Sequence, residues 1–208
     1  MMNSAIRRAL LGAAGITLTA TLSACAMPSD MDTGSSSPPP GATSELDTSV
    51  EPNAADVMFV GMMIPHHEEA VEMADMLLDK DGVDAEVVEL ATAIRAAQQP
   101  EIELMQSWLE AWDSTPAEGM GGMDHSDDSP MGSVMGMPAE DMRALEEASG
   151  PEASELFLEL MIVHHEGAIV MAQEALDEGR HPDVLALAQQ IADDQAAEID
   201  LMRSLLAS

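Results

Sequence analysis

Two stretches of the sequence match each other: residues 59–74 read FVGMMIPHHEEAVEMA, and residues 157–172 read FLELMIVHHEGAIVMA. A second match, between residues 94–107 and 191–204, follows with an offset of 97 residues instead of 98. One gap therefore aligns the two halves of the chain. The sequence predicts an internal duplication built around a His-His pair.

Each copy has the periodicity of two helices. Apolar residues recur at three- and four-residue spacing through residues 54–80, 84–112, 152–178 and 183–206, without the alternation of strands. We also expect a short helix around Ala139–Ala148. Two stacked helical hairpins predict an all-α four-helix bundle.

Glycine and proline mark the expected helix ends. Gly82 and Gly179 follow the first helix of each copy, where a left-handed C-cap is favoured. Pro151 and Pro182 fall in first turns, where the missing N–H costs little.

The beginning of the chain predicts export. Arg7 and Arg8 precede an apolar run over residues 9–18, and Leu22-Ser23-Ala24 precede Cys25, the only cysteine. The run is too short to span a bilayer and is typical of a signal peptide. The tetrad resembles a lipobox, which implies cleavage before Cys25 and a lipid on its sulfur. The alternative is an incidental cysteine; a disulfide is excluded in either case.

These features divide the chain into five segments. We expect a signal peptide over 1–24, a disordered Ser/Pro-rich stalk over 25–52, the first repeat over 53–113, a Met/Gly/Asp-rich linker over 114–138, and the short helix with the second repeat over 139–208.

The chain is strongly acidic. Loss of residues 1–24 removes two arginines and no acids, so the net charge changes from −32 to −34. This charge argues against nucleic acid and anionic membrane surfaces as partners and suits cations. The alternative is a solvated acidic surface that keeps the protein soluble.

The candidate metal ligands are histidines and methionines of the duplicated blocks. Met63 lies three residues before His66 and four before His67, so the three side chains share a helix face. The proposed ligands are His66, His67, His164, His165, Met63, Met73, Met161 and Met171. Further candidate ligands, or groups that support the ligands, are Glu69, Gln98, Glu101, Met105, Gln195, Glu198 and Met202.

Inward polar groups cost several kcal/mol unless they are paired. In one interpretation, the imidazoles, thioethers and carboxylates converge on a metal ion. In the other, His67 and His165 are structural and hydrogen-bond Glu101, Glu198 or the glutamines.

The linker adds soft ligands in a polar context. Its candidates are Met120, Met123, His125, Met131, Met135 and Met137. Core packing does not explain methionines in such a segment; the alternative is low-complexity drift. Thioethers select Cu(I), and imidazole binds either copper state or zinc, so copper is the expected metal.

The paired Met-Ile-Pro-His-His-x-x-Ala-x-x-Met-Ala and Met-Ile-Val-His-His-x-x-Ala-x-x-Met-Ala blocks resemble the family called domain of unknown function 305, over about residues 53–206. The resemblance implies a ferritin-like helical fold and, as in some exported members, copper binding and copper tolerance. It implies the four histidines as first ligands, with the nearby methionines. Val163 departs from the proline of the motif.

We therefore expect an exported, lipid-anchored metal-binding protein, a copper buffer, chaperone or tolerance protein, that is not an enzyme. One alternative is a non-catalytic interaction module with structural histidines. Another is a di-metal oxidase of ferritin-like type, although the repeats lack the Glu-x-x-His motif of such enzymes.

Overall fold

The computed structural model describes residues 46, 48–114 and 136–208. Within them, the regular secondary structure is helical throughout: α1 (Ala54–Leu78), α2 (Ala85–Ala111), α4 (Ala139–Glu147), α5 (Gly150–Glu178) and α6 (Pro182–Leu206). The all-α prediction is confirmed. The expected signal peptide, the expected lipidation site Cys25, most of the expected stalk and most of the linker lie outside the described residues.

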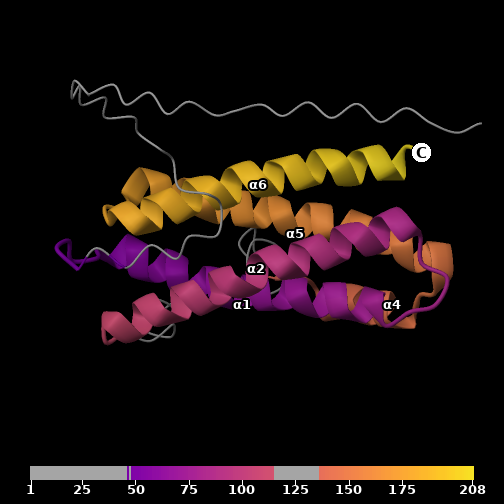
Figure 1. Cartoon of the computed structure of the whole chain (residues 1–208), viewed down its shortest axis with the longest axis horizontal. Helices are drawn as coiled ribbons and strands as arrows, with labels where there is room; N and C mark the ends of the chain where they lie inside the picture. The colour runs from indigo at the N-terminus through magenta and orange to yellow at the C-terminus, as the bar shows by residue number, and fades with distance from the viewer. Residues whose placement is uncertain (1–45, 47, 115–135) are drawn as a thin grey trace, which may run out of the picture. The chain divides into compact units, whose positions relative to one another are not determined.

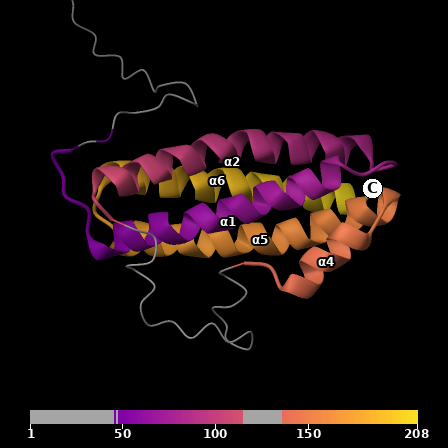
Figure 2. The same cartoon turned by 90° about the horizontal axis from the view of Figure 1, so that it is seen from below.

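The two repeats form two hairpins that pack together as a four-helix bundle (Figures 1 and 2). Helix α2 packs against α1, α6 packs against α5, and α1 and α5 run side by side in opposite directions. The short helix α4 lies against α1 and α5. None of the described helices is both long enough and apolar enough to cross a membrane.

The central position of α1 follows from its sequence. Phe59–Ile64 are buried without interruption, because partners cover this helix on several sides. The outer helix α6 instead buries a single stripe that includes Val184, Leu187, Ala188 and Ile191, and it exposes acidic residues on its other face. Such a stripe is typical of a helix at the surface of a bundle.

Most expected helix ends are confirmed. Pro151 and Pro182 lie in the first turns of α5 and α6. Asn53 caps α1 through a capping box with Asp56. Gly82, in the loop after α1, has a left-handed φ of 77°.

The prediction of a left-handed Gly179 is wrong. Its φ is −71°, in the extended region. The glycine is required by space instead, because a Cβ there would lie 2.5 Å from the Ala175 carbonyl oxygen and 2.7 Å from Oδ1 of Asp56.

The apolar core is divided into two clusters. The first core cluster contains Phe59–Ile64 of α1 and the α5 residues from Ala168 to Ala175. The second contains α1 residues from Ala70 to Leu77 and α5 residues from Ala153 to Met161. Between these segments lie the histidine pairs of both helices, which we call the histidine layer: His66, His67, His164 and His165.

Candidate metal centre

The histidine layer lies where α1 meets α5. The rings of His66 and His164, which are equivalent residues of the two repeats, stack with their centroids 3.7 Å apart and an interplanar angle of 31°. All four rings are buried, with exposed fractions of 0–2%. The duplicated motif therefore brings both copies to one place.

The other two histidines contact carboxylates of the outer helices. Nε2 of His67 lies 2.9 Å from Oε2 of Glu101, and Nε2 of His165 lies 2.7 Å from Oε2 of Glu198. An ionised carboxylate only accepts hydrogen bonds, so Nε2 is the donor, and in a neutral ring Nδ1 is then the nitrogen with the lone pair. These are the contacts that the structural interpretation of the histidines predicted.

Five ring nitrogens of the layer are unsatisfied: Nδ1 of each histidine and Nε2 of His164. Nδ1 is buried without a hydrogen-bond partner in His66, His67, His164 and His165. Buried polar atoms normally have partners, so such a group of exceptions requires an explanation. A bound cation would supply one.

The stacked pair is held in the neutral form. Burial lowers the pKa of His66 well below its usual value, and the neighbouring histidines lower it further. Burial also lowers the pKa of His164, although the Glu69 carboxylate partly offsets this effect. Neutral imidazole is the form that binds a metal ion.

Glu69 contacts the layer differently from the other two carboxylates. Its Oε2 lies 3.2 Å from Nε2 of His164, a nitrogen that has no hydrogen-bond partner. The same oxygen accepts a 2.8 Å hydrogen bond from the backbone N–H of Met137. Sequence reasoning selected Glu69 and Met137 separately and missed their contact, because 68 residues separate them.

The candidate methionines lie in the apolar clusters on both sides of the layer. Met63 and Met171 belong to the first core cluster, and Met73 and Met161 belong to the second. The structure thus pairs methionines of different repeats. The sequence grouped each methionine with the histidines of its own helix, because helical spacing shows only neighbours on one helix.

The expected supporting residues are also internal. Met105 lies in the first core cluster and Met202 in the second. Gln98 and Gln195, which are equivalent residues, are each 3% exposed. Neither Nε2 nor Oε1 of the Gln98 amide has a hydrogen-bond partner, and Oε1 of Gln195 has none either.

Two residues near the layer were not selected from the sequence. Gln190 donates a 3.1 Å hydrogen bond to Oε1 of Glu101 and so connects α6 to α2. The pKa of Asp194 is raised by partial burial and by the carboxylates of Glu101 and Glu198. Neither residue type stands out among the many acids and amides of α6.

The linker candidates fall mostly outside the described residues: Met120, Met123, His125, Met131 and Met135. Met137 is described, and its side chain packs against the second core cluster. Within the described part of the chain, no three histidine, cysteine, aspartate or glutamate side chains are close enough to hold one metal ion. A site at the histidine layer therefore needs ligands of another kind, and thioethers are the ones nearby.

Comparison with known proteins identifies relatives. The chain matches the family model described as Domain of unknown function (DUF305) over residues 56–206. No curated protein matches it. A DUF305 fragment from Deinococcus radiodurans is 30% identical, with a TM-score of 0.65, over 76% of this chain and 99% of that chain.

Two further solved structures are similar. A Streptomyces coelicolor DUF305 protein, described as a candidate secreted protein, is 31% identical with a TM-score of 0.63, over 74% of this chain and 91% of that chain. CopM in its Cu(II)-bound form is 31% identical with a TM-score of 0.60, over 73% of this chain and 95% of that chain. The matched model spans both repeats and the histidine layer between them, and the chain therefore belongs to the DUF305 family.

Proposed function

We propose that this protein is an exported, lipid-anchored copper-binding protein that acts as a buffer or chaperone. One observation carries the proposal: four buried imidazoles meet in one layer, each with an unpartnered Nδ1. Two of them are oriented through Nε2 by the carboxylates of Glu101 and Glu198. This is the usual arrangement of a histidine that binds a metal through its other nitrogen.

Ligand chemistry favours copper among the metals. The layer lies between two clusters that contain the buried thioethers of Met63, Met73, Met161 and Met171. Imidazole with thioether is the ligand set that selects Cu(I) over harder cations. The similar protein CopM has been solved with Cu(II), Cu(I) and silver.

Export and lipid anchoring rest on the sequence before the bundle. The apolar run over residues 9–18 and the Leu-Ser-Ala-Cys tetrad ending at Cys25 support cleavage and lipidation. The description of the Streptomyces coelicolor relative as a candidate secreted protein agrees with export. The lipid would hold the protein at the outer face of the cell membrane or in the periplasm. The proposed activity is binding, not catalysis.

The test is an anaerobic competition titration with Cu(I) on residues 26–208. It compares the wild type with a variant in which His66, His67, His164 and His165 are changed to alanine. We expect tight binding that this variant loses. Binding that survives in full would place the site elsewhere and contradict a copper centre in the histidine layer.

Two controls keep the titration interpretable. His125→Ala removes one imidazole from the linker and should leave the bundle site intact. Because the fourfold variant removes several buried groups, its helicity must be checked by circular dichroism. If it unfolds, the double variant His66→Ala/His164→Ala replaces it.

A structural role for the histidines is the second candidate, and the contacts of His67 with Glu101 and of His165 with Glu198 favour it. In that case Cu(I) would leave the melting temperature unchanged, and His67→Ala would destabilise the metal-free protein. Copper binding predicts instead a melting temperature that rises with the concentration of free metal.

A further inference from the structure

The two repeats do not supply the histidine layer equally. His164 has the carboxylate of Glu69 3.2 Å from its Nε2. The residue equivalent to Glu69 in the second repeat is Gly167, which is buried and has no side chain to offer. No equivalent carboxylate therefore reaches His66. The carboxylate beside the stacked pair therefore comes from the first repeat alone.

Gly136 and Met137, which are described at the end of the linker, lie beside Glu69. Oε2 of Glu69 accepts the backbone N–H of Met137 at 2.8 Å. Gly136, with φ of 154°, allows this approach, because a Cβ there would lie 3.2 Å from the same oxygen. A single carboxylate oxygen thus contacts the chain end of the linker and a buried imidazole.

Glu69 differs from the other carboxylates of the layer in its hydrogen-bond partner. Glu101 and Glu198 make aligned hydrogen bonds of 2.9 and 2.7 Å to their histidines. Nε2 of His164 has no hydrogen-bond partner although Glu69 lies 3.2 Å away, and Glu69 is bonded to the backbone of Met137 instead. The Glu69 side chain is 21% exposed, similar to the 15% of Glu101 and the 23% of Glu198.

We propose that Cu(I) enters and leaves the histidine layer on the His164 side, at the junction of Glu69 and Met137. The anionic carboxylate attracts the cation at the surface, and the thioether of Met137, whose side chain packs against the second core cluster, offers a soft ligand at the edge of the cluster that contains Met73 and Met161. Glu69 is a positioning residue in this scheme, since it acts on the ion's passage to His164. The inference rests on the proposed copper binding.

The test is stopped-flow transfer of Cu(I) from the loaded protein, residues 26–208, to an excess of a chromophoric Cu(I) chelator. Glu69→Gln keeps the size and an acceptor oxygen but removes the charge, and Met137→Leu removes the thioether. We expect each to slow this release on the order of tenfold, the lower end of the effect of groups that support a metal site. Stoichiometry and melting temperature should stay unchanged.

Matched controls separate this effect from charge and packing. Glu68→Gln removes the same charge one residue away, on an exposed side chain. Met142→Leu removes another thioether that packs against the second core cluster. Both should exchange Cu(I) at the wild-type rate. In the double variant Glu69→Gln/Met137→Leu, the two effects should not multiply, because they act at one point.

The outcomes distinguish two failures. If the wild type binds no Cu(I), the proposed function is wrong and this inference falls with it. If it binds Cu(I) and the Glu69 and Met137 variants exchange it at the wild-type rate, or the controls slow it equally, only the exchange point is wrong.

Discussion

The two repeats place equivalent residues at opposite ends of the bundle, and the two ends are closed differently. Asp56 of α1 and Ser154 of α5 are equivalent, and both are buried. The backbone N–H of His181 donates to Asp56 at 3.2 Å, and that of the equivalent Asp84 donates to Ser154 at 2.9 Å. One repeat thus fixes the hairpin turn of the other at each end.

The Asp56 end is more densely bonded. The Asp56 carboxylate also accepts the N–H groups of Arg180 at 3.0 Å and Asn53 at 2.8 Å. Close by, the Trp112 ring packs against Trp108 and against the buried His181.

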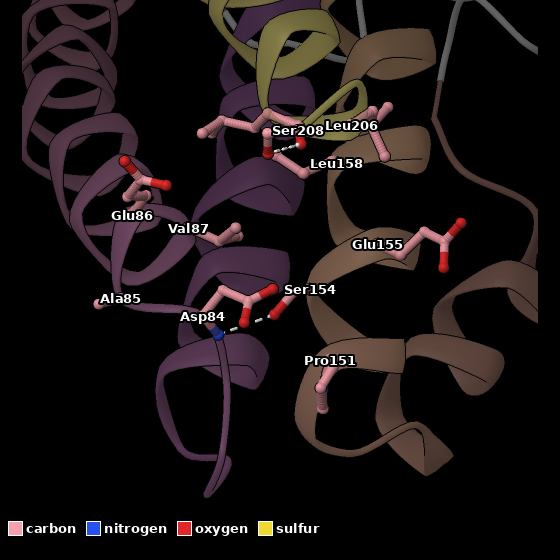
Figure 3. Close-up of a pocket in the computed structure, with 11 residues that line it drawn as sticks. Asp84, Ala85, Glu86, Val87, Pro151, Ser154, Glu155, Leu158, Leu206 and Ser208 are labelled. Atoms are coloured by element: carbon pink, nitrogen blue, oxygen red, sulfur yellow. Dashed lines mark hydrogen bonds between the residues drawn. The ribbon is translucent and has the colours of Figure 1, made fainter.

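The Ser154 end is more open. A pocket of about 580 Å³ lies there between the ends of α2, α5 and α6 (Figure 3). Leu205, the equivalent of Trp108, lines it together with Ser154 and Asp84. The two ends thus share one hydrogen bond, from a backbone N–H of the turn to a buried side chain of the other repeat, while the side chains around it differ.

The largest expected effect is at Asp56. Asp56→Ala removes the carboxylate that accepts the N–H groups of Asn53, Arg180 and His181, so we expect a loss of about 3 kcal/mol in the free energy of unfolding. The equivalent Ser154→Ala should cost about 1 kcal/mol, since one hydrogen bond is lost. Urea unfolding followed by circular dichroism measures both. Equal losses would show that the two ends are equivalent after all.

Exchanging the large side chains tests the packing difference. Trp108→Leu should cost about 3 kcal/mol, because it leaves a cavity in the first core cluster. The reciprocal Leu205→Trp enters the existing pocket and should change the free energy of unfolding by only about 1 kcal/mol. Thermal unfolding measures the two variants. If Leu205→Trp lost as much stability as Trp108→Leu, the pocket would be unable to accept an indole ring.

The pKa values of His66 and His164 are lowered to different extents, so the two residues should contribute differently to the pH dependence of stability in the metal-free protein. A lowered folded-state pKa means that the unfolded chain binds protons first, so stability is full above pH 6.5 and falls as the pH drops below it. The melting temperature should therefore decrease from pH 7.5 to pH 5. His66→Gln should flatten this decrease more than His164→Gln does, because Glu69 offsets the burial of His164. If the melting temperatures of the two variants depended equally on pH, the proposed difference between His66 and His164 would be wrong.

The smallest effect concerns Asp194, whose equivalent in the first repeat is Ala97. Asp194→Ala removes an exposed carboxylate near Glu101 and Glu198. We expect a gain of no more than about 0.5 kcal/mol at low salt, which high salt should screen. Unfolding at two salt concentrations measures it; a loss of stability would show that Asp194 supports these carboxylates.

Much of the fold was predictable because it depends on local spacing. The apolar periodicity placed α1, α2, α5 and α6 within a few residues, and Pro151 and Pro182 marked two helix starts. The histidine pairs were identifiable as a centre because they are duplicated. Gly179 was misjudged because a sequence shows that a glycine is present, but not whether backbone angle or space requires it.

The sequence by itself determined the duplication, the helices and the residue types available for a metal. Only the tertiary structure decided how they combine: that His66 stacks on His164, that Met63 shares a cluster with Met171, and that Glu69 contacts both Met137 and His164. Helical periodicity fixes which side chains share a face. Which faces meet depends on packing between segments nearly a hundred residues apart, and that packing also sets the burial that keeps the two stacked imidazoles neutral.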